Sequence, residues 1–295
     1  MSEIKIDALL PAEMATRAEY LGVRKAEMPV FTMFMLSLLA GAFISLGSIF
    51  ATTVAAGGMS VVAADGALAY STGLPFGVTR LLTGLVFSLG LILVVVGGAE
   101  LFTGNNLIVM AWASGKVTGR ALLRNWIIVY AGNFIASIAT AALMFFTKQY
   151  TFGADAVGIT ALRIGVAKCE FGFVQAVALG ILCNALVCLA VWLTYSARTT
   201  IDKIVSIIFP ITAFVTAGFE HSVANMYFIP YALLVKAFDP QYMARVSDKV
   251  PHLEALTWKA FFINNLIPVT IGNIIGGAVL VAAIYWVVFL REKKS

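Results

Sequence analysis

Three side chains that can exchange a proton or balance a charge lie inside long apolar stretches of the chain: Glu100, Glu220 and His221. An ionisable group among apolar residues is unfavourable unless it is paired or solvated, so each is a candidate functional residue. An imidazole titrates near neutral pH and can both donate and accept a proton. These residue types therefore indicate proton exchange or charge compensation in an apolar environment.

Composition identifies that environment as a lipid bilayer. Of the 295 residues, 61% are hydrophobic and only 12% are charged, and the mean hydropathy is +0.94. A soluble domain cannot bury so much apolar surface, and the same numbers exclude disordered, collagen-like and disulfide-scaffold classes. The net charge of +5 does not point to a nucleic-acid partner in such a chain. The sequence predicts an integral membrane protein.

A spanning helix needs about 20 apolar residues, and six segments with at most one charged residue each are long enough. They run from about Val30 to Ala55, Leu81 to Gly115, Asn125 to Thr147, Phe171 to Ala197, Ile204 to Val235 and Ala260 to Leu290, and the second and fifth contain Glu100 and Glu220. An even number of crossings places both termini on one side. Basic residues are more frequent in the tails and the even-numbered loops, which favours cytoplasmic termini.

The first and second halves of the chain repeat two motifs in the same order. The string from Gly98 to Asn105 matches the string from Gly218 to Asn225 at its first glycine, its glutamate and its asparagine. Further on, six of eleven residues in the string starting at Asn125 are identical to those in the string starting at Asn265. Three crossings per copy orient the copies oppositely in the membrane, as in channels and secondary transporters.

Glycine and asparagine are poor helix formers that suit turns and helix ends, so the duplicated motif predicts breaks in the second and fifth spans. Irregular backbone at that depth must line a cavity or be buried in protein. The residues assigned to these breaks are Gly98, Glu100, Asn105, Gly218, Glu220 and Asn225. The predicted fold is all-α, with six transmembrane helices in two inverted three-helix repeats.

The domain boundaries follow from the same pattern. We expect a cytoplasmic amphipathic segment at 1–28, one transmembrane domain at 29–291 and a tail at 292–295. The repeats cover about 29–147 and 170–291. The N-terminal segment is either an interfacial anchor or a gate over the inner mouth of a pathway.

The duplication separates the three ionisable side chains into two kinds. Glu100 and Glu220 occupy matching positions, which predicts the same structural task twice: accepting backbone N–H groups or pairing with a basic helix end. His221 has no counterpart, because Leu101 stands at its position. The histidine is therefore the functional candidate, with a neutral resting ring beside the positive end of a helix dipole.

The strings from Phe87 to Leu91, Gly98 to Thr103, Gly218 to Asn225 and Asn265 to Asn273 resemble the formate–nitrite transporter family over nearly the whole chain. The resemblance implies a homopentamer in a bacterial inner membrane, with an aquaporin-like pore for formate or formic acid in each protomer. It implies neither a cofactor nor a metal ion, and no enzymatic activity.

The resemblance also assigns residues to the pore. His221 matches the central histidine, and Thr103 matches a residue that hydrogen-bonds the substrate or the histidine. Lys168 matches a vestibule lysine that draws anions in. Phe87, Leu91 and Phe214 match residues of an apolar constriction. Asn184 and Asn273 match polar positions near the pore.

Blander interpretations of these residues stay open on sequence grounds. The three constriction residues lie at helical spacing and could be packing residues, Lys168 could be a snorkelling anchor, and Asn184 and Asn273 could join helices by hydrogen bonds. Nitrite or hydrosulfide is the alternative substrate, since each is the anion of a small weak acid. A membrane enzyme would need a second catalytic group or metal ligands, which the spans do not provide.

Overall fold

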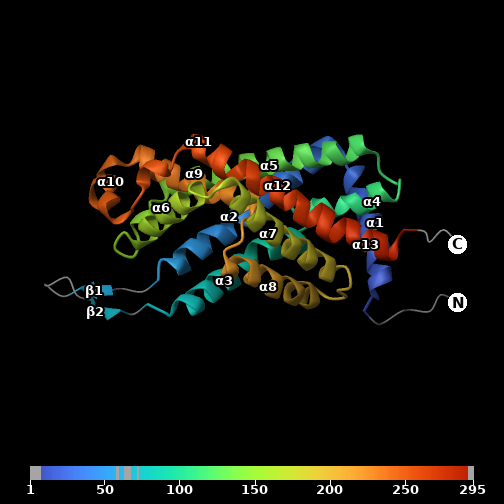
Figure 1. Ribbon diagram of the computed structural model, residues 1–295, viewed down its shortest axis with the longest axis horizontal. Helices are drawn as coiled ribbons and strands as arrows, with labels where there is room; N and C mark the ends of the chain where they lie inside the picture. Colours follow the sequence, from blue (N-terminus) through green and yellow to red (C-terminus); the bar gives the residue numbers. More distant parts are fainter. Residues whose placement is uncertain (1–7, 58–59, 63–67, 72, 292–295) are drawn as a thin grey trace.

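The structure of the protein is a computed structural model that describes residues 8–57, 60–62, 68–71 and 73–291 (Figure 1). The predicted tail at 292–295 and the first seven residues of the N-terminal segment lie outside the described residues. Two apolar residues of that segment, Ile4 and Ile6, fall there as well.

The described residues of the first half form five α-helices, two short strands and a 3₁₀ helix before the connection to the second half. Their bounds are α1 Pro11–Ala26, α2 Val30–Ala55, β1 Ser60–Val62, β2 Leu68–Ser71, α3 Phe76–Gly97, η1 Gly104–Ile108, α4 Val109–Ala113 and α5 Gly119–Phe146. The strands β1 and β2 lie between α2 and α3 and pair antiparallel as a small hairpin.

The second half follows through a 3₁₀ turn and ends in one long, partly π-helical span. Its elements are η2 Gln149–Thr151, α6 Ala156–Cys169, α7 Phe173–Thr194, α8 Thr200–Ala217, α9 Ser222–Phe238, α10 Pro240–Val246, η3 Ser247–Lys249, η4 Leu253–Ala255, α11 Trp258–Ala260, η5 Phe261–Leu266, α12 Ile267–Ile274, η6 Ile275–Ala283 and α13 Ile284–Phe289. The elements α11 to α13 form a continuous segment from Trp258 to Phe289.

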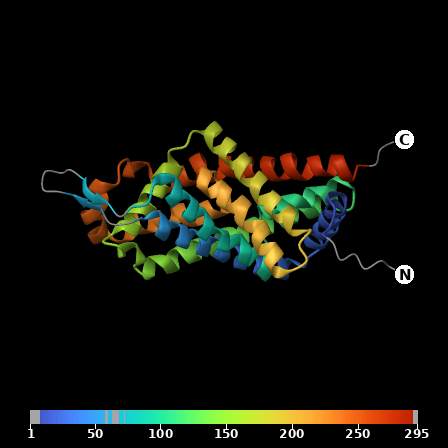
Figure 2. The same ribbon diagram turned by 90° about the horizontal axis from the view of Figure 1, so that it is seen from below.

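Six helical segments in the described part of the chain are long and apolar enough to cross a membrane, which confirms the predicted fold class. They are α2, α3, α5, α7, α8 and the segment from Trp258 to Phe289. The helices α1 and α13 lie at one end of the molecule, and the hairpin and α10 lie at the other, in both views (Figures 1 and 2). The described ends of the chain therefore share a side, as six crossings require.

The second and fifth spans break where the duplicated motif predicts. The helix α3 ends at Gly97 and α8 ends at Ala217, and the next residues, Gly98 and Gly218, adopt left-handed φ values of +82° and +80°. Glycine has no Cβ to oppose this conformation and commonly ends helices in this way. The chain then turns before η1 in the first half and before α9 in the second.

The two broken spans pack closely against each other through small residues. A Cβ atom placed on Gly84 of α3 would lie 2.6 Å from the carbonyl oxygen of Thr212 on α8. Without that glycine the two backbones could not approach to this distance. The close approach brings Phe87 of α3 and Phe214 of α8 together, with 5.7 Å between the ring centroids.

The amphipathic N-terminal segment folds as α1 and packs on protein. Its buried face consists mainly of small residues, including Ala15, Ala18 and Ala26, together with Met14. The apolar residue Leu10, just before α1, is 67% exposed. The segment is thus docked on the protein through its small residues.

Candidate functional site

His221 lies at the break of the fifth span and caps the N-terminus of α9. Its Nδ1 accepts a hydrogen bond of 3.0 Å from the backbone N–H of Ala224. Because a backbone N–H can only donate, Nδ1 carries a lone pair, and the proton of the neutral ring is on Nε2. The ring is 3% exposed, and the cap fixes its orientation.

Thr103, from the break of the second span, is the partner of the histidine. Its Oγ1 lies 2.9 Å from Nε2 of His221. In the tautomer that the cap requires, Oγ1 accepts a hydrogen bond from the Nε2–H group. The carbonyl of Thr103 in turn accepts hydrogen bonds from Asn184 Nδ2 and Cys188 Sγ. The structure therefore joins the two breaks through a buried imidazole–hydroxyl pair.

Aromatic rings close the space beside this pair. The rings of Phe87 and Phe214 meet edge to face, and the Phe214 ring stacks on the imidazole of His221 with 6.0 Å between centroids. Phe87 and Leu91 lie one turn apart on α3, and both are buried. An uncharged solute passes such a contact far more easily than an ion does.

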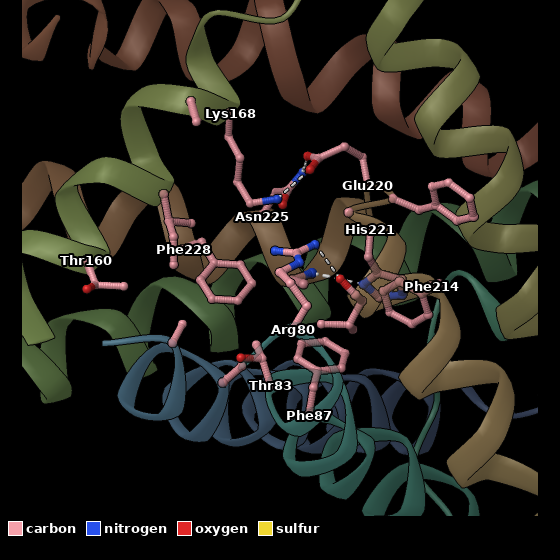
Figure 3. Close-up of a pocket in the computed structure, with 18 of the residues that line it drawn as sticks. Arg80, Thr83, Phe87, Thr160, Lys168, Phe214, Glu220, His221, Asn225 and Phe228 are labelled. Carbon is pink, nitrogen blue, oxygen red and sulfur yellow. Dashed lines mark hydrogen bonds and ion pairs between the residues drawn. The ribbon is translucent and has the colours of Figure 1, made fainter. Parts of the chain in front are cut away.

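One cavity lies on each side of these apolar residues. The first, which we call the α6-side cavity, has a volume of about 350 Å³ and is lined by charged, polar and aromatic residues that include Arg80, Thr83, Phe87, Lys168, Phe214, Glu220, His221 and Phe228. Figure 3 shows the side chains of Arg80, Lys168 and His221 around it, with the rings of Phe87 and Phe214 near each other.

The second, the α1-side cavity, has a volume of about 290 Å³ and is lined by residues that include Arg17, Lys25, Leu91, Leu101, Gly104 and Lys203. Phe87 thus faces one cavity and Leu91 the other. Of the three expected constriction residues, Phe87 and Phe214 therefore line the α6-side cavity, and Leu91 lines the α1-side cavity.

A buried ion pair supports the break in the first half. Lys25 Nζ lies 2.6 Å from Glu100 Oε1, and Asn105 Nδ2 donates to Glu100 Oε2 at 2.7 Å and to Asn125 Oδ1 at 2.9 Å. Asn125 Nδ2 then donates to the carbonyl of Lys25 at 3.0 Å. The four residues form a closed network between the end of α1 and the broken span.

The second half repeats this network. Lys168 Nζ lies 2.6 Å from Glu220 Oε1, Asn225 Nδ2 donates to Glu220 Oε2 and to Asn265 Oδ1, both at 2.7 Å, and Asn265 Nδ2 donates to the carbonyl of Lys168 at 2.9 Å. Two tasks were expected of Glu100 and Glu220. The carboxylate side chains perform the second one, because each forms an ion pair with a lysine in the last turn of a helix. The helix α6 stands in the second half where α1 stands in the first.

Asn273, expected near a pore, holds the broken backbone. Its Oδ1 accepts from Ser222 N at 2.9 Å, and its Nδ2 donates to the carbonyls of Glu220 and Gly180 at 2.9 and 2.8 Å. Asn133 makes the equivalent set of bonds in the first half. The residue is fully buried and does not appear among the described residues that line either cavity.

Asn184, the other polar position expected near a pore, joins the two halves. Its Nδ2 lies 3.2 Å from the carbonyl oxygen of Thr103, 3.0 Å from Asn106 Oδ1 and 2.7 Å from the carbonyl oxygen of Asn273. Asn184 is not among the described residues that line the α6-side or the α1-side cavity. Its contacts are those of an interhelical hydrogen-bonding residue, the alternative that the sequence left open.

Lys168 lines the α6-side cavity, as expected, but its charge is balanced by Glu220. Its side chain is only 14% exposed, so the ammonium group belongs to the buried network.

Sequence reasoning missed the equivalent role of Lys25. The signal was present, since Lys25-Ala-Glu27 precedes the first span as Lys168-Cys-Glu170 precedes the fourth. It also missed Arg80, which faces the α6-side cavity.

Comparisons with known proteins place this architecture in a family. The family model described as formate/nitrite transporter matches residues 12–287. The formate channel FocA of Escherichia coli (strain K12) is 43% identical, over 97% of this chain and 96% of its own length. FocA of Haemophilus influenzae is 40% identical, over 93% of this chain and 92% of its own length.

A solved structure titled as a pentameric formate channel with formate bound is also similar. It superposes with a TM-score of 0.78 and 42% identity, covering 89% of this chain and 98% of the solved chain. The matched relatives are channels and transporters rather than enzymes. The six-span fold with its two broken helices, the duplicated Lys–Glu–Asn–Asn networks and these matches lead to one conclusion: the chain belongs to the formate/nitrite transporter family.

Proposed function

We propose that this protein conducts formate, as formic acid at the narrowest point, through a pathway that joins the α6-side and α1-side cavities past His221. The observation that carries the proposal is the His221–Thr103 pair at the edge of the α6-side cavity, beside the rings of Phe87 and Phe214. The names of the similar channels support formate as the substrate.

Neutralising the anion is the favourable route past the rings. Moving a carboxylate from water into an apolar medium costs on the order of 20 kcal/mol in the ideal case and several kcal/mol after relaxation. Formic acid carries no such charge. The pathway therefore needs a proton at the point where formate leaves the α6-side cavity.

The tautomer of His221 determines how a proton can be relayed. The neutral ring holds its proton on Nε2 and donates it in a hydrogen bond to Thr103. A second proton can bind only at Nδ1, which must then release the backbone N–H of Ala224. From the resulting imidazolium, the Nε2 proton passes to Thr103 Oγ1 while the Thr103 hydroxyl proton passes to formate. One proton enters at Nδ1 and one leaves in formic acid, which leaves the neutral ring with its proton on Nδ1. Release of that proton and return of one proton to Nε2 through Thr103 restore the capped tautomer for the next cycle.

The assembly and placement of the chain are parts of the same proposal. A similar solved structure is titled pentameric, and we infer that this chain forms a homopentamer with one pathway per protomer. Large apolar side chains such as Phe31, Ile127, Phe146 and Phe209 are exposed on the surface of the spans, where lipid or a neighbouring protomer can cover them. We place the protein in a bacterial inner membrane, with cytoplasmic termini, from its relatives and the distribution of basic residues.

Solute uptake into proteoliposomes tests the proposal. Purified protein is reconstituted, and the uptake of labelled formate is measured alone and against competing nitrite and hydrosulfide. We expect saturable formate uptake that increases as the external pH falls. If nitrite or hydrosulfide is taken up in preference to formate, that anion is the substrate and the assignment of formate is wrong. Uptake equal to that of protein-free vesicles for all three anions would overturn the proposal.

A further inference from the structure

The described residues that line the α6-side cavity carry one more positive charge than negative charge. Arg80 and Lys168 line this cavity together with Glu220. Lys168 and Glu220 neutralise each other at 2.6 Å, and the ring of His221 is neutral in its capped tautomer. The charge that remains in the cavity is that of the Arg80 guanidinium.

The guanidinium is held by the end of a neighbouring helix. Its Nε donates to the carbonyl of Thr216 at 3.0 Å, and its Nη2 donates to the carbonyl of Val215 at 2.5 Å. Both carbonyls belong to the last turn of α8, which ends at Ala217. A cation is favoured there because the C-terminus of a helix carries the negative end of its dipole.

These contacts leave one edge of the guanidinium unused. An arginine has five N–H groups in a rigid planar fork, and the two carbonyls of α8 use the edge formed by Nε and Nη2. Among the residues that the structure describes, no hydrogen-bond acceptor is recorded for Nη1. The opposite edge, formed by Nη1 and the second N–H of Nη2, suits a two-oxygen planar anion.

Helical spacing places this edge above the constriction. Arg80, Thr83 and Phe87 all line the α6-side cavity and follow the i, i+3, i+7 pattern of one face of α3. Arg80 therefore lies two turns, or about 10 Å along the helix axis, before Phe87. Figure 3 shows the three side chains along one side of the cavity.

We infer that Arg80 is the anion-capturing and specificity-determining residue of the α6-side cavity. This inference rests on the proposed function and deepens it. The free edge binds a planar monovalent oxyanion, such as formate or nitrite, through two parallel N–H···O bonds before the anion meets His221. Hydrosulfide has a single acceptor atom, so it cannot form two parallel hydrogen bonds to separate atoms and fits the fork less well.

Concentration-dependent influx into proteoliposomes tests the assignment. Formate, nitrite and hydrosulfide are measured separately for wild type, Arg80→Gln, Arg80→Lys and the charge-matched control Arg163→Gln. Arg163 is exposed on α6 and donates to the carbonyl of Lys249, away from the lining of the α6-side cavity. Purified protein is also tested for stabilisation of its Tm by added formate, which reports binding without transport.

For Arg80→Gln we expect the half-saturating concentration of formate to rise by about 10-fold, the loss typical of a charge-assisted bond. We expect little change in the maximal flux. Arg80→Lys keeps the charge but not the fork, so its defect should be larger for formate and nitrite than for hydrosulfide. Arg163→Gln should match wild type.

Two results would overturn the assignment. One is an Arg80→Gln variant whose half-saturating formate concentration equals that of wild type. The other is a variant whose flux falls only in proportion to a fall in Tm, because that would show a purely structural contact with α8. If wild type carries no formate, the proposed function fails by itself. The Tm shift then decides on Arg80: formate stabilisation that is lost in Arg80→Gln supports the site, and equal or absent stabilisation in both proteins overturns it.

Discussion

The two broken spans are held by matching networks of the same four residue types, but the networks differ in the hydrogen bonding of one asparagine oxygen. In the first half, Asn105 Oδ1 accepts a hydrogen bond of 3.0 Å from Lys25 Nζ. In the second half, the equivalent Oδ1 of Asn225 is buried without a partner among the described residues. Lys168 Nζ instead lies 5.5 Å from the centre of the Phe228 ring. The duplication therefore preserves the frame, while its second copy keeps spare hydrogen-bonding capacity beside the α6-side cavity.

The same comparison applies to the proposed relay. His221 stands where the first half has Leu101, and Thr103 stands where the second half has Val223. Each member of the hydrogen-bonded pair occurs in one copy only, and the two meet across the interface of the copies. A symmetric frame thus supports an asymmetric pair, because each half contributes one of the two polar groups.

Breaking the two ion pairs should reveal the largest difference between the halves. We expect Glu220→Gln to lower the free energy of unfolding by about 3–5 kcal/mol, because it leaves Lys168 buried without a counter-ion. Glu100→Gln should cost clearly less, since Lys25 is 28% exposed, against 14% for Lys168, and keeps its bond to Asn105. Denaturation in detergent measures both.

The double variant Lys168→Gln/Glu220→Gln is the control for that experiment. It removes both charges, so it should recover part of the stability that Glu220→Gln loses. Equal losses for Glu220→Gln and Glu100→Gln would contradict the proposed difference in burial.

Thr103→Val should reduce formate flux by about 10-fold, because it leaves the Nε2 proton of His221 without an acceptor and removes the hydroxyl of the relay. The variant copies the residue type found at position 223. Thr103→Ser keeps the hydroxyl and should retain most of the flux. Uptake into proteoliposomes compares the two, and a valine variant as active as the serine variant would rule out the hydroxyl step.

The asparagines of the two networks offer a smaller test. Asn105→Ala should destabilise the protein by about 1 kcal/mol more than Asn225→Ala, since only Asn105 also accepts from a lysine. Denaturation of both variants under one condition provides the comparison. A greater loss for Asn225→Ala would show that its free oxygen has a partner in solution.

The smallest expected effect concerns the exposed end of α6. His252 Nδ1 lies 2.6 Å from Glu170 Oε1, and this hydrogen bond raises the pKa of His252 above 6.5. The stabilisation that this contact contributes is therefore fully present below the pKa of the unfolded state. It is lost as the pH rises through the pKa of the folded state. NMR titration should place the midpoint above 6.5 in wild type and lower in Glu170→Gln. An unchanged midpoint in the variant would exclude the carboxylate as the cause.

Local sequence patterns were sufficient for the architecture. Charge-poor apolar segments predicted the six spans, and Gly98 and Gly218 marked the two breaks because left-handed backbone favours glycine. The repeated asparagines pointed to equivalent positions in the two halves. Hydropathy could not show the short hairpin between the first two spans, which contains few residues and no long apolar run.

The partners in the site could not be predicted in the same way. Lys25 and Glu100 are 75 residues apart in the chain, and only the docking of α1 brings them together. The anchoring of Arg80 depends on where α8 ends, and the position of Asn184 depends on how α7 packs against η1 and α12. Such contacts follow from the packing of rigid elements, whereas sequence periodicity shows only which elements exist.

The formate flux of His221→Leu, measured between about pH 5 and 8 where an imidazole titrates, is the most direct test of the proposed pathway. This substitution gives position 221 the residue type of its counterpart at 101. The proposal predicts flux at least about 10-fold below wild type and a flattened dependence on pH. Flux and pH dependence equal to those of wild type, in a variant that folds and assembles normally, would contradict it.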